Sequence, residues 1–91
     1  MVLPKLISDR WNAKHFEKMN DGDKDVDNAQ KLEQLGCIQK AIYRYETAII
    51  KFKKAEGFAT LLGNKDYKAK AESRIGQAEQ NIEDLKEILG Y

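Results

Sequence analysis

The chain has 91 residues, 34% of them charged, and a formal net charge of +1 at pH 7. This length suits one domain with one modest core, and so small a net charge gives no overall field that attracts nucleic acid or a membrane surface. The single cysteine, Cys37, excludes an intramolecular disulfide. One proline and a high content of charged helix formers favour an all-α chain.

Residues 1–20 are predicted to form a short amphipathic helix or arm. Apolar residues recur there at steps of three and four, at Leu6, Ile7, Trp11, Phe16 and Met19. Because Trp11 and Phe16 are large for a surface, they either dock on the rest of the domain or form a partner site. The stretch 2–7 is too short and interrupted for a signal peptide, and no window reaches the roughly 20 apolar residues of a membrane span. We therefore expect a cytoplasmic protein.

The segment Asn20–Asp25 predicts a break in the helical pattern, because short polar residues and Gly22 compete with the helix. Four aspartates at alternate positions in 21–27 also suggest a calcium-binding loop, because alternating carboxylates can surround the ion. The spacing of an EF-hand loop fails, since Val26 and Leu32 stand where glycine and glutamate are required. We expect a polar loop in which Asp25 or Asp27 caps the next helix, and no metal site.

Three further helices are expected at about 26–35, 37–62 and 66–89. Gly36 leaves one choice open, because it suits a turn and is also tolerated inside a single long helix over 26–62. From Leu35 onward a heptad pattern is clean up to Glu56. Its apolar positions are Leu35, Ile38, Ile42, Tyr45, Ile49 and Phe52.

A second turn is predicted at Gly63–Asp66, with Gly63 as a left-handed helix end and Asn64 or Asp66 as the next N-cap. The last helix carries an apolar stripe at Ile75, Ala78, Ile82, Leu85 and Leu89. Helices joined by so short a turn are antiparallel neighbours. The pattern predicts an all-α antiparallel three-helix bundle over 26–89, with residues 1–20 as an extra N-terminal helix. In the alternative, residues 1–20 are the first helix and 26–62 is one rod.

Residues that carry chemistry are scarce. The sequence has no glycine-rich phosphate loop and no metal-ligand spacing, and its one histidine, His15, lies in a different segment from Cys37. We expect neither an enzyme nor a cofactor. Lysines near the second turn suggest a basic patch, but a nucleic-acid-binding domain is usually much more basic.

The central helix carries more apolar residues than one packed face needs. Tyr43 and Ile50 lie seven residues apart, on a stripe displaced from the heptad core. Either a third helix covers this stripe, or it lines a groove that receives a helix of a partner.

The pattern Gly36-Cys-Ile-x-x-Ala41-Ile42-x-x-Tyr45-x-x-Ala48-Ile49-x-x-Phe52, followed by Ile75-x-x-Ala78-Glu79, resembles the MIT (microtubule interacting and trafficking) domain. The first two helices of that family are also similar to a tetratricopeptide unit. The resemblance covers about residues 26–89 and implies an antiparallel three-helix bundle.

This resemblance implies a non-catalytic domain in membrane trafficking that binds short helical motifs in the tails of ESCRT-III-type proteins, between the second and third helices. Ile75 and Ala78 would form pockets for the peptide, and Glu79 would meet its basic residue. The apolar stripe of the central helix adds Tyr43 and Ile50, which would form the side of the peptide groove that belongs to this helix. The alternatives are a self-associating hairpin, which forms a homodimer, and a nucleic-acid-binding helical module.

Overall fold

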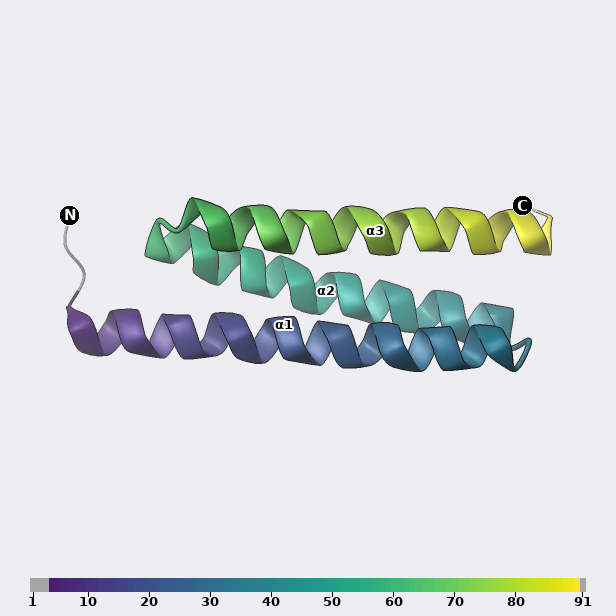
Figure 1. Ribbon diagram of the computed structural model, residues 1–91, viewed down its shortest axis with the longest axis horizontal. Helices are drawn as coiled ribbons and strands as arrows, with labels where there is room; N and C mark the ends of the chain where they lie inside the picture. Colours follow the sequence, from purple (N-terminus) through teal and green to yellow (C-terminus); the bar gives the residue numbers. More distant parts are fainter. Residues whose placement is uncertain (1–3, 91) are drawn as a thin grey trace.

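The computed structural model describes residues 4–90, and these form three α-helices without any strand. The helices are α1 (Lys5–Gln34), α2 (Ile38–Leu62) and α3 (Lys65–Leu89), which run up, down and up. Figure 1 shows α2 lying between α1 and α3 along a body with extents of 50 × 18 × 14 Å. The predicted three-helix bundle is confirmed. Residues 1–3, which open the predicted N-terminal arm and the stretch weighed as a signal peptide, lie outside the described residues.

The predicted break at Asn20–Asp25 is wrong, because α1 runs without interruption from Lys5 to Gln34. Residues 5–20 therefore belong to α1 and form no separate helix, and the expected helix over 26–35 is the last part of α1. Contacts with α2 explain the difference. A Cβ atom added at Gly22 would lie only 2.5 Å from a ring carbon of Phe52, so the missing side chain lets α1 approach α2 closely.

Two of the four aspartates that suggested a loop have partners on the other helices. Asp25 is buried and accepts charged contacts from Lys51 and Arg44 on α2 rather than capping a helix. Asp23 pairs with Arg74 of α3, with 3.0 Å between Oδ1 and Nε. Packing and ion pairing thus hold in a helix a segment whose local composition favours a loop.

The turn between α1 and α2 answers the question left open at Gly36. Gly36 has a φ of +79°, and the Cys37 amide donates to the Leu32 carbonyl while the Gly36 amide donates to that of Glu33. This is a Schellman ending, in which a left-handed glycine satisfies the last carbonyls of the helix. The first helix ends here and a second one begins at Ile38, so residues 26–62 do not form one continuous helix.

The second turn follows the prediction closely. Gly63 has a φ of +67°, and the Asn64 side chain accepts a hydrogen bond of 3.0 Å from the Tyr67 amide. Gly63 thus ends α2, and Asn64 is the N-cap of α3.

The core consists of two clusters strung along the bundle. One lies towards the α1–α2 turn around Ile42, Tyr45 and Ile82, and the other lies around Phe52, Met19 and Ala71. Buried alanines on all three helices, such as Ala29, keep the helices close together. The heptad prediction holds for its central residues. It is wrong for Leu35, which is 77% exposed because the turn carries it out of the core.

The aromatic residues near the start of α1 close the other end of the bundle. His15 is buried, and its Nδ1 lies 2.8 Å from the carbonyl oxygen of Ala55 on α2. Its ring stacks on Tyr67 of α3, with centroids 4.8 Å apart, and Phe16 packs edge-on against both rings. Phe16 is therefore docked on the bundle, although 45% of it remains exposed.

Candidate functional site

A shallow groove of about 400 Å³ runs between α2 and α3, where the sequence predicted a partner site. Its apolar surface comes from three isoleucines, of which Ile82 is buried, Ile49 is partly buried and Ile50 is 55% exposed. The full lining consists of Glu46, Ile49, Ile50, Lys53, Glu79, Ile82, Glu83 and Lys86. The lining residues span about two turns of each helix.

Charged side chains form both rims of this α2–α3 groove. Glu46 and Lys53 stand on α2, and Glu79, Glu83 and Lys86 stand on α3. Within residues 4–90, no ion pair or side-chain hydrogen bond engages any of these five groups. Their charges are therefore available to a ligand that lies in the groove.

The structure brings two of the five predicted site residues together. Ile50 from α2 and Glu79 from α3 both line the groove. Ile50 supplies an exposed apolar contact, and Glu79 supplies a carboxylate, which are the chemical properties for which each residue was singled out.

The other three predicted residues lie elsewhere. Ala78 is 2% exposed within the core beside Ile42, and Ile75 packs against the cluster around Phe52. Tyr43 is 65% exposed on α2 and does not line the groove. The apolar stripe of α3 thus mainly serves the core, and its member Ile82 lines the groove as well.

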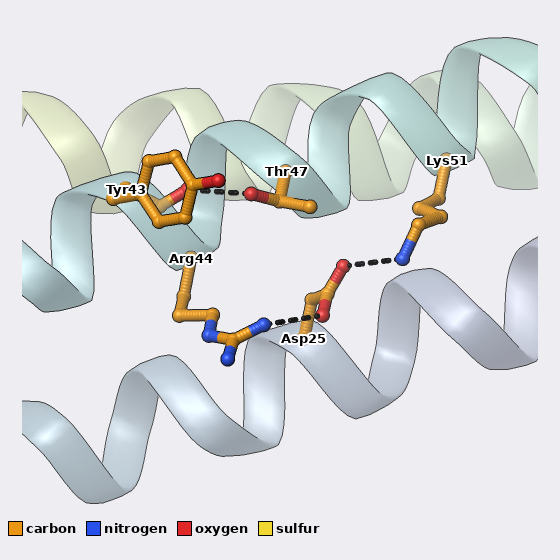
Figure 2. A network of polar contacts seen from close by, with 5 residues as sticks. All are labelled: Asp25, Tyr43, Arg44, Thr47 and Lys51. Atoms are coloured by element: carbon orange, nitrogen blue, oxygen red, sulfur yellow. Dashed lines mark hydrogen bonds and ion pairs between the residues drawn. The ribbon is translucent and has the colours of Figure 1, made fainter.

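A polar network on the α1–α2 side of the bundle is structural. Figure 2 shows the Asp25 carboxylate between Lys51 and Arg44, at 2.9 Å from the lysine Nζ and 3.6 Å from the arginine Nη1. Nearby, the Thr47 hydroxyl donates to the backbone carbonyl of Tyr43. A buried carboxylate needs such partners to offset the loss of its hydration, so this network fixes α1 against α2.

A second buried polar group links the same two helices. The Tyr45 phenol donates a hydrogen bond of 3.0 Å to a carboxylate oxygen of Glu33. Burial, this hydrogen bond and the carboxylate charge raise the pKa of Tyr45 from 10.0 to about 12. The phenol thus stays protonated and holds the C-terminal end of α1.

The described residues provide little for other kinds of site. Among residues 4–90, no three His, Cys, Asp or Glu side chains come together in a way that could hold a metal ion. None of the three helices is long and apolar enough to cross a membrane.

Sequence reasoning missed most of the residues that line the groove. The missed signal is a matched spacing, with Glu46, Ile49 and Lys53 on α2 and Glu79, Ile82 and Lys86 on α3, each set at steps of three and four. Antiparallel helices joined by a short turn place these two segments side by side. Apart from Glu79, the charged members lie off the apolar stripes, which are the strongest pattern in the sequence.

No family model, curated protein or solved structure matches this chain.

Proposed function

We propose that the protein is a non-catalytic interaction domain whose α2–α3 groove binds a helical segment of a partner protein. The observation that carries the proposal is the pairing, in one groove, of the exposed Ile50 with rim charges that have no partner within residues 4–90. An exposed apolar surface with a polar rim is typical of protein-binding sites.

The dimensions of the groove favour a helix as the ligand. It follows two antiparallel helices for about two turns each, and a third helix laid along them contacts it with residues at i, i+3, i+4 and i+7. An extended peptide would instead seek an open sheet edge, which the all-helical structure of residues 4–90 does not offer.

The charges suggest the composition of the ligand. The lining of the groove includes three carboxylates, from Glu46, Glu79 and Glu83, and two lysines, Lys53 and Lys86. A segment with leucine-like residues on one face and a basic residue directed at Glu79 matches this arrangement. It is also the kind of ligand that the MIT resemblance implies, which makes ESCRT-III-type tails the first partners to test and a cytoplasmic trafficking role the context we propose.

The proposal is tested by fluorescence anisotropy with a labelled helical tail peptide of an ESCRT-III-type protein. We expect Ile50→Asp to weaken binding at least about tenfold, because it places a charge on the apolar floor of the groove. Glu79→Lys is expected to weaken binding by a few-fold, since it opposes the basic residue of the peptide.

Ile88→Asp provides the matched control. Ile88 is 68% exposed on α3 and lies outside the groove, so the same substitution leaves both the fold and the binding unchanged. Circular dichroism checks that all three variants remain helical. Equal loss of binding in Ile50→Asp and Ile88→Asp, or wild-type binding by Ile50→Asp, would contradict the groove assignment.

A further inference from the structure

A second surface hollow lies between α1 and α2 and shares no residue with the α2–α3 groove. It measures about 340 Å³ and is lined by Lys18 of α1 and by Lys54, Gly57, Phe58 and Leu61 of α2. Its volume is near the lower end of the range for sites that bind small ligands, roughly 300–1,000 Å³. Because α1 contributes a single residue to its lining, this α1–α2 hollow can receive one or two side chains rather than the length of a helix.

The floor of the hollow is apolar and open. Phe58 is partly buried, Leu61 is 52% exposed, and Gly57 contributes backbone alone. A Cβ atom added at Gly57 would meet no atom within 4 Å, so the space beside this glycine is open among residues 4–90. Exposed aromatic and aliphatic surface beside bare backbone suits an inserted apolar side chain.

Three cations on the same pair of helices have carboxylate partners within the protein. Lys51 and Arg44 share the Asp25 carboxylate, and Lys14 pairs with Glu17 at 3.3 Å. Within the described part of the chain, neither Lys18 nor Lys54 takes part in an ion pair. The hollow therefore combines an apolar floor with two ammonium groups that lack an internal counter-charge.

We propose that the α1–α2 hollow is a second docking site, which binds an apolar side chain flanked by carboxylates on an acidic helical segment of a partner protein. Charge complementarity with Lys18 and Lys54 selects the acidic residues, and the concave floor selects the apolar one. A membrane surface fits less well, because anionic lipids are attracted by clusters of about four to eight basic residues rather than by two lysines beside a concavity. The site is independent of the α2–α3 groove, so the domain can hold two segments at once.

The probe is a labelled alanine-rich helical peptide of about 15 residues, a length at which such a peptide begins to be helical. It carries phenylalanine at its centre and glutamate one turn before and one turn after. A second peptide has lysine in place of both glutamates. We expect the glutamate peptide to bind the protein and to shift the amide resonances around Lys54 and Phe58, and the lysine peptide to bind roughly tenfold more weakly, because it faces two like charges.

Gly57→Met tests the floor of the hollow, and Gly76→Met is its control. Both glycines lie in helix interiors with open space around them, but Gly76 is on α3 and does not line the hollow. Both substitutions therefore improve helix propensity to the same extent. Only Gly57→Met is expected to fill the hollow and to reduce binding of the glutamate peptide about tenfold or more.

Charge reversal completes the test. The double variant Lys18→Glu, Lys54→Glu is expected to lose the glutamate peptide and to gain the lysine peptide, whereas Glu79→Lys in the other groove leaves both unaffected. The proposal is overturned if the glutamate peptide does not bind, if Gly57→Met and Gly76→Met bind it equally well, or if the two peptides bind the wild-type protein alike. It is also overturned if vesicles rich in anionic lipid displace the peptide.

Discussion

Gly22 shows how one absent side chain sets the distance between two helices. It lies in the middle of α1, where glycine costs about 1 kcal/mol relative to alanine. In return, the ring of Phe52 occupies the space that a Cβ atom would take, and Phe52 itself is fully buried. The packing of Phe52 accounts for a residue that looks like a helix breaker in the sequence.

We expect Gly22→Ala to destabilise the protein by about 1–2 kcal/mol, because the overpacking against Phe52 outweighs the gain in helix propensity. Chemical denaturation measures the change in the free energy of unfolding. The control is Gly76→Ala, at a glycine with open space around it, which is expected to stabilise the protein by about 0.5–1 kcal/mol. A stabilising effect of Gly22→Ala would show that Phe52 does not pack against α1.

Tyr45 gives the protein an alkaline pH dependence. Its pKa is about 12 in the folded protein against 10.0 for the ordinary phenol, so folding favours the protonated form. The stabilisation is complete below pH 10 and is lost as the pH rises from 10 towards 12, because the unfolded chain then releases its proton first.

Tyr45→Phe is therefore expected to lower stability at pH 8 through loss of the hydrogen bond to Glu33, and to flatten the fall in stability above pH 10. Denaturant titrations at several pH values measure both effects. Tyr43→Phe is the matched control, since Tyr43 is 65% exposed. If Tyr45→Phe and the wild type lost stability in parallel above pH 10, the protonated phenol would not be what the fold requires.

At the scale of the elements, the length of α1 is the feature that local composition does not predict. Its 30 residues include four aspartates in seven positions, and three of its five buried residues are His15, Gly22 and Asp25. Gly22 and the aspartates predict a break when the sequence is considered alone. In the structure His15, Gly22 and Asp25 each contact a neighbouring helix, and the sum of such contacts outweighs weak helix propensity.

Amide hydrogen exchange measures this continuity directly. We expect the amides of residues 20–27 to exchange as slowly as those of the α1 residues on either side, because they lie within the hydrogen-bonded helix beside the core. Exposed residues at the first turn of α1 serve as the fast-exchanging reference. Rapid exchange confined to residues 20–25 would restore the predicted loop and contradict the single helix.

For the whole molecule, the position of α2 decides which surfaces remain open. Figure 1 shows α2 between α1 and α3, and α2 packs on both of them. A surface depression lies along each of these two pairs of helices. The α2–α3 depression is the groove with mixed charges, and the α1–α2 depression is the hollow framed by lysines. A domain of this shape offers more than one face to partner segments.

The proposed function requires these faces to be free in solution. We expect sedimentation velocity to give a single monomeric species whose coefficient does not change with protein concentration, since a groove that accepts a partner segment is not occupied by a second copy of the chain. A tight dimer that dissociates on Ile50→Asp would instead support the self-associating hairpin, in which the groove contacts a second copy of the chain.

The sequence by itself determined the all-helical class, the turn at Gly63–Asn64 and the central residues of the apolar stripes, because these follow from backbone conformation and periodicity within one segment. Only the tertiary structure decided that α1 is continuous, that Gly36 is a turn, and that Ile50 and Glu79 share a groove while Ile75 and Ala78 pack into the core. The physical reason is that these outcomes depend on contacts between helices. A close approach such as Gly22 on Phe52, or a buried charge such as Asp25, has its stabilising partner far away in the chain.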